Sequence, residues 1–309
     1  MPAEVRVFAP ATVANVAAGF DILGFALGEP GDKIRIRKTN APGIVLHNET
    51  AFTDMPLDPA ANTAGVALQA MLDHLGSREG FEITFLHKIK PGSGIGSSAA
   101  SSAAAVYGAN YLLGEPLSRQ QLVPFAMEGE RLASGTAHAD NVAPALLGGF
   151  VLVRSYHPLD LISITAPPRL FCSIVHPQIE LKTEDARKVL KKQISLKDAV
   201  VQWGNVAGLI AGLFREDYGL IGRSLQDVIV EPIRSLLIPG YDRIKEAALA
   251  AGALGCSISG SGPSLFALST NEDDARRIAT AMITTCVDCG MESESYVSTV
   301  NGQGAVILP

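Results

Sequence analysis

The stretch Pro91-Gly-Ser-Gly-Ile-Gly-Ser-Ser-Ala-Ala-Ser-Ser102 carries the strongest structural signal in the chain. Glycine lets a backbone turn sharply and approach a ligand closely, and here Gly92, Gly94 and Gly96 occupy alternate positions. An alanine-rich run with high helix propensity follows, up to Ala109. A glycine loop that opens a helix directs free main-chain N–H groups and the positive end of the helix dipole at one point, which suits phosphate. The stretch therefore predicts a nucleotide-phosphate site, with a kinase as the first interpretation.

Four interpretations of this loop compete. A Walker A loop needs a lysine after its last glycine, and none follows Gly96. Residues 94–99 match the dinucleotide string G-x-G-x-x-A, but the acid expected about 20 residues later is Glu115, in a predicted turn between helices. A third interpretation uses the Ser98 hydroxyl as a Mg²⁺ ligand, together with the carboxylate of Glu130 on the next predicted helix. The fourth is a tight turn that binds nothing.

The composition is that of a folded globular protein. The 309 residues are 47% hydrophobic and 18% charged, a length that suggests about two domains. The net charge is −6 and no basic block is present, which argues against nucleic acid as a partner. No secretory signal and no apolar run of about 18 residues is visible. We therefore expect a cytoplasmic protein that has no nucleic-acid or membrane partner.

Cys286 and Cys289 form a C-x-x-C pair inside a predicted helix over residues 273–288. A redox pair is activated at the start of a helix, and a zinc site needs two further ligands that the sequence does not supply nearby. We interpret the pair as two reduced thiols.

Hydrophobic periodicity predicts the secondary structure. The predicted strands are 4–9, 33–38, 81–89, 150–154, 170–175, 256–258, 264–268, 294–299 and 304–308. The predicted helices are 62–75, 97–113, 118–134, 183–192, 196–214, 241–251 and 273–288. The absence of strict βαβ alternation favours an α+β fold. The Pro167-Pro168 pair marks the join between two expected domains, 1–164 and 165–309, and the last two strands are expected in the second.

Three motifs in order along the chain resemble those of the GHMP small-molecule kinases. They lie in Ala9–Asp21, Pro91–Ala100 and Gly255–Ser264. The resemblance implies a two-domain α+β fold with the active site between the domains. The N-terminal half would be similar to domain 2 of ribosomal protein S5, and the C-terminal half would be ferredoxin-like.

Within that family, the first motif resembles the homoserine kinases, as do residues 137–145, 182–187 and 231–234. The resemblance implies ATP-dependent phosphorylation of the side-chain hydroxyl of L-homoserine to O-phospho-L-homoserine, a step toward threonine. A zwitterionic substrate suits such residues, since its carboxylate needs a guanidinium and its ammonium a carboxylate or amide oxygen. The implied substrate-binding residues are Asn15, Asp21, His138, Asn141, Thr183, Arg187 and Arg234.

The same resemblance implies the nucleotide site and the chemistry. The implied ATP-binding residues are Asn62, Pro91, Gly92, Ser93, Gly94, Ile95, Gly96, Ser97, Ser98 and Gly260. Ser98 and Glu130 are the implied Mg²⁺ ligands. Two catalytic alternatives stay open: Asn141 orients the homoserine hydroxyl without a base, or Asp140 acts as the base. Relatives in the family are often dimers, so a homodimer is expected.

Overall fold

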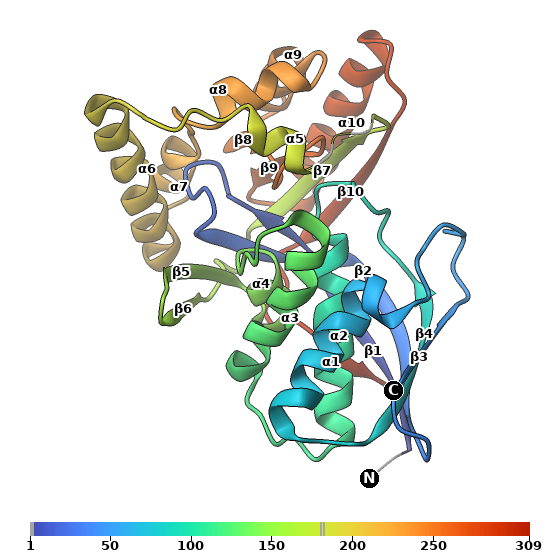
Figure 1. Ribbon diagram of the computed structural model, residues 1–309. Helices are drawn as coiled ribbons and strands as arrows, with labels where there is room; N and C mark the ends of the chain where they lie inside the picture. Colours follow the sequence, from blue (N-terminus) through green and yellow to red (C-terminus); the bar gives the residue numbers. More distant parts are fainter. Residues whose placement is uncertain (1–2, 180, 182) are drawn as a thin grey trace.

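The computed structural model of this protein describes residues 3–179, 181 and 183–309. It contains two separate β-sheets with helices packed on them, so the expected α+β class is confirmed (Figure 1).

The first sheet is built almost entirely from the N-terminal half. Its path is β11-β1-β2-β4-β3, with β5 paired to β2 and β6 paired to β5. All of these pairs are antiparallel except β3 with β4. The strands are β1 (Glu4–Ala14), β2 (Leu23–Thr39), β3 (Ile44–Asn48), β4 (Gly80–His87), β5 (Phe150–Tyr156), β6 (Leu159–Ile164) and β11 (Val306–Leu308).

The first sheet is covered by a layer of helices, and α2 lies directly on β1 and β2 (Figure 1). The elements of this layer are a short 3₁₀ turn (Pro59–Ala61), α1 (Thr63–Leu75), α2 (Ser97–Leu112), α3 (Arg119–Ser134) and α4 (Val142–Leu147). The helix α3 begins with a capping box in which Ser118 and Gln121 satisfy each other's main-chain N–H groups, and it ends at Gly135.

The second sheet has the antiparallel order β10-β7-β9-β8, with α9 and α10 packed on it. Its strands are β7 (Phe171–Pro177), β8 (Gly255–Ile258), β9 (Leu265–Ser269) and β10 (Ser293–Thr299). The helical elements of this half are α5 (Thr183–Lys188), α6 (Leu196–Arg215), α7 (Tyr218–Ser224), α8 (Glu231–Arg234), a 3₁₀ turn (Ser235–Leu237), α9 (Tyr241–Ala250) and α10 (Glu272–Asp288).

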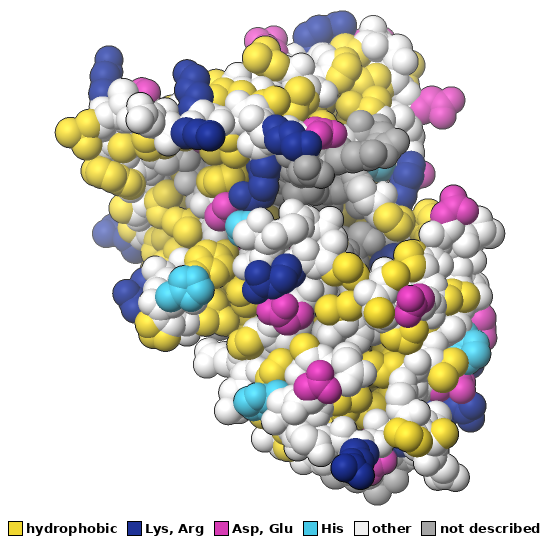
Figure 2. All heavy atoms as spheres, viewed as in Figure 1, with side chains coloured by type: hydrophobic (Ala, Val, Ile, Leu, Met, Phe, Trp, Pro, Cys, Tyr) yellow, Lys and Arg dark blue, Asp and Glu magenta, His cyan; other side chains and the backbone are white. Residues whose placement is uncertain are grey.

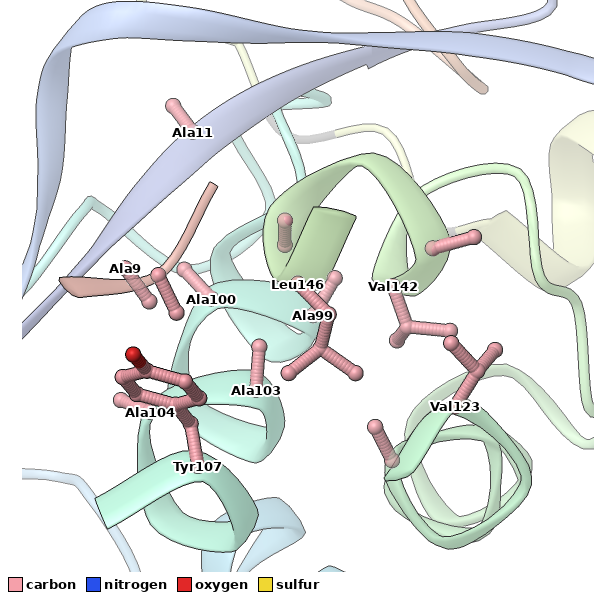
Figure 3. Close-up of a cluster of buried hydrophobic side chains, with 14 of the residues drawn as sticks. Ala9, Ala11, Ala99, Ala100, Ala103, Ala104, Tyr107, Val123, Val142 and Leu146 are labelled. Carbon is pink, nitrogen blue, oxygen red and sulfur yellow. The ribbon is translucent and has the colours of Figure 1, made fainter. Parts of the chain in front are cut away.

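The alanine run makes α2 a core helix. Small side chains of α2 face Ala9 and Ala11 of β1 on one side and Val123 of α3 on another (Figure 3). At Gly108 a Cβ would lie 2.6 Å from Ile36 Cγ2 and 2.8 Å from Val7 Cγ2. The helix can therefore sit close against the sheet, and this contact holds the glycine loop at its N-terminus in place.

Two differences from the sequence expectations stand out. The last strand, β11, was expected in the second domain, but it pairs with β1 in the first sheet, so that part of the prediction is wrong. Strand β2 runs from Leu23, far upstream of the predicted 33–38, and bends through Gly28, Pro30 and Gly31, which hid it from a pattern based on alternation. The short elements α4, α7, α8, β3 and β6 were not predicted.

The four cysteines are free thiols, and Cys286 is buried in α10 while Cys289 caps that helix. Burial raises the pKa of the Cys286 thiol. Among the residues described, no helix combines the length and the apolar character needed to cross a bilayer.

Candidate active site

The glycine loop links β4 to α2 and takes a conformation that only glycine adopts easily. Gly92, Gly94 and Gly96 have φ angles of 77°, 77° and 71°. A Cβ on Gly96 would lie 2.1 Å from the Thr12 hydroxyl oxygen, and one on Gly94 would lie 2.6 Å from the Gly262 carbonyl oxygen. The loop is therefore packed between the other two motifs, and helix α2 begins directly after it at Ser97.

Hydrogen bonds join the three motifs into one unit. The Ser259 hydroxyl donates to the Gly94 carbonyl at 2.8 Å. The Thr12 main-chain N–H donates to the Ile95 carbonyl at 3.1 Å. The Asn15 side-chain amide donates to the Gly260 carbonyl at 2.7 Å. Residues separated by almost the whole chain length thus meet at the end of the phosphate loop.

A cleft of about 1050 Å³ opens beside this junction. It is lined by 16 of the residues that the sequence singled out: Asn15, Asp21, Asn62, Pro91, Gly92, Gly94, Gly96, Ser97, Ser98, Glu130, His138, Asp140, Asn141, Arg187, Arg234 and Gly260.

Two other predicted residues do not line the cleft with their side chains. Ile95 is in the hydrophobic core, and Ser93 is buried with its carbonyl accepting from the Ser264 hydroxyl at 2.5 Å. A contact from either to a phosphate group would have to come from the main chain. The side chain of Thr183 lies outside the described part of the structure, so its predicted contact has no structural account.

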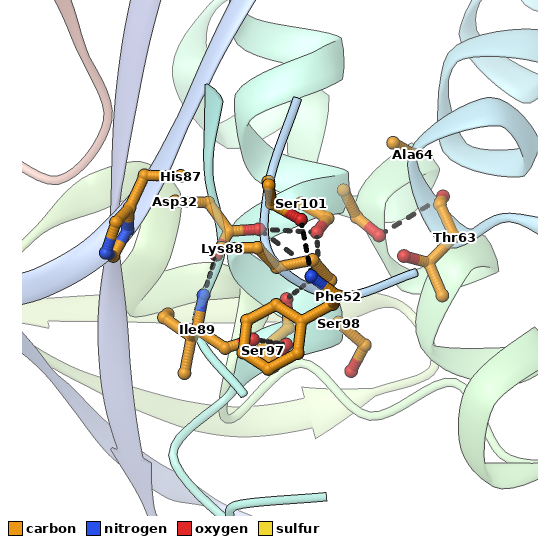
Figure 4. A network of polar contacts seen from close by, with 12 residues as sticks. Asp32, Phe52, Thr63, Ala64, His87, Lys88, Ile89, Ser97, Ser98 and Ser101 are labelled. Atoms are coloured by element: carbon orange, nitrogen blue, oxygen red, sulfur yellow. Dashed lines mark hydrogen bonds and ion pairs between the residues drawn. The ribbon is translucent and has the colours of Figure 1, made fainter. Parts of the chain in front are cut away.

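The next feature is a buried polar network at the start of α2 (Figure 4). The Ser98 hydroxyl donates to Glu130 on α3. The Lys88 ammonium contacts the fully buried Asp32 carboxylate at 3.3 Å and the Ser101 hydroxyl at 2.5 Å. Burial raises the pKa of Glu130, and the Ser98 hydrogen bond and the charge of Lys88 oppose this only in part.

Glu130 and Ser98 fit a Mg²⁺ ion. Both present oxygen atoms, the ligands that Mg²⁺ prefers, and among the described residues the buried Glu130 carboxylate is hydrogen-bonded only by the neutral Ser98 hydroxyl. Within the described residues no cluster of three or more His, Cys, Asp or Glu side chains could hold a metal. A Mg²⁺ ion here would complete its coordination with phosphate oxygens and water.

In the same cleft, Asp21 and Arg187 form a two-pronged ion pair. The Arg187 Nη2 atom lies 2.7 Å from Asp21 Oδ1, and its Nη1 atom 3.2 Å from Oδ2. The main-chain N–H of Asp21 also donates a hydrogen bond to Asn15 Oδ1 at 3.0 Å. The segment between them is strained, because Asn15, Val16 and Ala17 have φ angles of 70°, 42° and 58°.

Arg234 lies beside this pair and is almost completely buried. Its Nε donates to the Ala186 carbonyl at 3.1 Å and its Nη1 to the Gly260 carbonyl at 2.9 Å. Burial, reinforced by the charge of Arg187, lowers the pKa of Arg234 to about 10. The ring of Phe20 lies 5.1 Å from the Arg234 guanidinium and 5.6 Å from that of Arg187. Two guanidiniums therefore lie close together in the site, and among the described residues the carboxylate of Asp21 pairs with Arg187.

His138, Asp140 and Asn141 also line the cleft. Both ring nitrogens of His138 are buried and have no hydrogen-bond partner among the described residues, and burial lowers the pKa of its imidazole. Asp140 is 3% exposed. Burial, together with the charges of Asp21 and Glu130, raises the pKa of Asp140 to about 8. The Thr12 hydroxyl donates to Asn141 Oδ1 at 2.7 Å, which fixes how the Asn141 amide faces.

Sequence reasoning missed four residues that shape this site: Thr12, Asp32, Lys88 and Tyr156. The Tyr156 hydroxyl donates to the Asp21 carbonyl at 2.7 Å and accepts from the Ala139 N–H at 3.3 Å, so it ties the first motif to the His138 segment. Lys88, three residues before Pro91, could have been found as a cation next to a phosphate loop. Asp32 and Tyr156 left no local signal, since they reach the site only through strand pairing.

Family models and known proteins agree with this arrangement. The model for the GHMP kinases N terminal domain matches residues 62–149, and that for the GHMP kinases C terminal matches residues 209–288. A homoserine kinase from Chloroherpeton thalassium is 51% identical, with 99% of each chain covered. The chain belongs to the GHMP kinase family.

Solved structures of family members extend the comparison. A crystal structure of homoserine kinase from Cytophaga hutchinsonii superimposes with a TM-score of 0.95 at 53% identity, covering 100% of this chain and 98% of that one. A mevalonate kinase from L. major, in complex with R-mevalonate, has the same fold, with a TM-score of 0.72 at 19% identity and 95% of each chain covered. The expected two-domain GHMP kinase fold is confirmed.

Proposed function

We propose that this protein transfers the γ-phosphoryl group of ATP to the side-chain hydroxyl of L-homoserine, giving O-phospho-L-homoserine. One observation carries the proposal: a paired carboxylate and guanidinium line the same cleft as the glycine loop. That arrangement suits a small zwitterion whose far end must reach a phosphate. Homoserine kinases with about half of their residues identical to this chain support the choice of amino acid.

Homoserine would bind by exchanging partners with the Asp21–Arg187 ion pair. Its carboxylate takes the place of Asp21 on Arg187, with Arg234 beside it, and its ammonium takes the place of Arg187 on Asp21. Every charge is then paired again, which matters because leaving a buried charge unpaired is costly. A substrate that lacks either charged group would leave Asp21 or Arg187 without its partner.

ATP would place its phosphates on the glycine loop. The main-chain N–H groups at the start of α2 and the positive end of its dipole face the cleft there. Lys88 lies nearby, although the Asp32 carboxylate already balances its charge. We place Mg²⁺ between Ser98 and Glu130, where it would neutralise charge on the β- and γ-phosphates.

The transfer itself would need no side-chain base. The hydroxyl oxygen of homoserine attacks phosphorus as the bond from phosphorus to the β-phosphate oxygen breaks, and the hydroxyl proton passes to a non-bridging oxygen of the transferred group. Since Thr12 occupies Asn141 Oδ1, the Asn141 NH₂ group is the side positioned to donate to the attacking oxygen. A pKa of about 8 leaves Asp140 mostly protonated at neutral pH, which favours this alternative over Asp140 as base.

Free thiols at all four cysteines suit a cytoplasmic enzyme.

A coupled assay of ADP release tests the function. L-Homoserine is compared with 4-hydroxybutyrate, which lacks the ammonium, with homoserinol, which lacks the carboxylate, and with mevalonate and galactose. Loss of one charged hydrogen-bonded group, worth ~1.5–3 kcal/mol, should lower kcat/KM about 10- to 150-fold for each of the first two analogues. Asp21→Asn should reduce the difference in kcat/KM between homoserine and 4-hydroxybutyrate. Turnover of mevalonate or galactose with none of homoserine would overturn the proposal.

A further inference from the structure

The inner face of α6 carries a buried glutamine, Gln202, that belongs to none of the three motifs. In Figure 1, α6 lies at the left edge of the molecule, and Figure 2 shows hydrophobic side chains gathered over it there. The outer face exposes Trp203 and Phe214, whereas Gln202 is only 7% exposed. A polar side chain buried to this degree needs hydrogen-bond partners within the protein, so those partners define what Gln202 contributes.

Both N–H groups and the oxygen of the Gln202 amide are in use. Its Nε2 atom donates to the Ala18 carbonyl at 2.9 Å and to Asp227 Oδ1 at 3.0 Å. Its Oε1 atom accepts from the Val228 main-chain N–H at 3.0 Å. Only one orientation of the amide satisfies these two acceptors and one donor. A carboxylate could not donate the first two bonds and an ammonium could not accept the third, so this junction requires an amide.

The bond to Ala18 reaches the segment that contains Asn15 and Asp21. Residues 15, 16, 17 and 21 all have positive φ, which non-glycine residues adopt only where the surrounding structure holds them there. The Ala18 carbonyl lies within this segment and is held by Gln202. The residue therefore helps to fix the backbone that presents the Asp21 carboxylate to the cleft.

The bond to Asp227 reaches the segment that leads into α8, the helix that contains Arg234. The Asp227 carboxylate accepts from the main-chain N–H groups of residues 229–231, each at 2.9 Å, so it fixes the start of α8. Burial lowers the pKa of Arg234, and Asp227 lies close enough for its charge to oppose this. Through Asp227, Gln202 therefore acts on the backbone that carries Arg234.

We propose that Gln202 is a positioning residue for the amino-acid substrate, which fixes the place of Asp21 relative to Arg234. The proposal rests on the function proposed above, in which Asp21 binds the ammonium of homoserine while Arg187 and Arg234 bind its carboxylate. Gln202 itself is not one of the described residues that line the cleft. Homoserine carries both charged groups on one carbon atom, so it gains from two partners at a fixed separation, whereas a ligand with one charged group does not.

The ADP-release assay with homoserine, 4-hydroxybutyrate and homoserinol tests the proposal. Gln202→Met keeps the length of the side chain and removes its hydrogen bonds. The selectivity, which is the ratio of kcat/KM for homoserine to kcat/KM for either analogue, should fall at least ~5-fold, because each analogue needs only one of the two charged partners. KM for ATP should not change. This ratio does not depend on what fraction of the variant is folded, so lower stability alone cannot produce the result.

Two further variants complete the experiment. Gln202→Glu keeps the acceptor oxygen but cannot donate both bonds, and it gives the same readout if the methionine variant does not fold. The matched control is Asn205→Leu, since Asn205 lies one turn further along α6 and donates to the Gln226 carbonyl at 3.0 Å. This control removes a hydrogen bond between the same helix and the same segment, leaves the Ala18 carbonyl bonded, and should keep the selectivity unchanged.

A smaller fall in selectivity in both Gln202 variants, or an equal fall in Asn205→Leu, overturns the proposal. The unmodified enzyme separates this outcome from a failure of the proposed function. If it does not phosphorylate homoserine, the function itself is wrong; if it does and the Gln202 variants keep its selectivity, only the positioning role is wrong.

Discussion

The substitution Asp140→Asn separates the two catalytic alternatives. Asp140 is buried near the carboxylates of Asp21 and Glu130, and its raised pKa of about 8 leaves it about one-tenth ionised at pH 7. An asparagine has nearly the shape of the protonated acid. If Asp140 is protonated and does not act as a base, the variant should keep kcat within about threefold of the unmodified enzyme at pH 7.

A general base would behave differently with pH. Its ionised fraction in the free enzyme would grow from about 1% at pH 6 to about 50% at pH 8, so kcat/KM would rise about 50-fold over that range. The assay is the ADP-release measurement at low substrate concentrations from pH 6 to pH 8, and the readout is the ratio of kcat/KM between the two enzymes. We expect this ratio to be independent of pH. A ratio that climbs with pH, together with a 10²- to 10⁴-fold loss at Asp140→Asn, would refute the base-free mechanism.

The same variant gives a stability measurement in which other titrating groups cancel. The pKa of Asp140 is raised on folding from 3.8 to about 8, so the stability it contributes is complete below pH 4 and is lost as the pH rises through 8. At 1.36 kcal/mol per pH unit, the unmodified protein should lose about 4 kcal/mol relative to Asp140→Asn between pH 5 and pH 8. Urea unfolding of both proteins at each pH measures this. A relative loss below about 1 kcal/mol would mean that the carboxyl is not held neutral.

Three further substitutions test other parts of the site. Glu130→Gln removes the carboxylate but can keep a hydrogen bond to Ser98, so the Mg²⁺ concentration for half-maximal rate should rise at least ~10-fold with the melting temperature little changed. Lys88→Met leaves the Asp32 carboxylate buried without its cation and should cost about 3–5 kcal/mol in urea unfolding; an unchanged midpoint would contradict this. Tyr156→Phe removes the hydrogen bond to the Asp21 carbonyl and should raise KM for homoserine about fivefold, with KM for ATP unaffected.

Much of the fold follows from local pattern. The helix after the glycine loop, predicted over 97–113, is α2 at Ser97–Leu112, and the predicted helix 118–134 is α3 at Arg119–Ser134, because caps and periodicity are encoded within a few residues. The pairing of β11 with β1 joins residues about 300 positions apart, and no local signal predicts such a partner. The first part of strand β2 was not predicted, because its glycines and proline indicate the end of a strand, whereas in the structure the strand continues through them.

The composition of the site was predictable where motifs carried it. The motifs named the glycines and the serines, and the stretches at 182–187 and 231–234 named the two arginines. The structure brings Ser97, Ser98, Arg187 and Arg234 to the same cleft as the glycines of the loop. Tyr156 and Asp32 could not be found in this way, because each acts through a strand that meets the motif only in the folded chain. The charge state of Asp140 could not be predicted from the sequence either, since it depends on burial and on the neighbouring carboxylates.

The sequence by itself determined which chemical groups are present: a glycine loop at a helix start, the hydroxyl and the acid that we propose for a metal, and the charged groups that we propose for a zwitterion. Only the tertiary structure decided which of these groups pair with one another and which are exposed. It pairs Asp21 with Arg187, sets Lys88 against Asp32, and exposes one face of α6. The reason is physical: residue types and local backbone preferences are written along the chain, whereas burial, charge pairing and exposure depend on distances that exist only after distant segments have packed together.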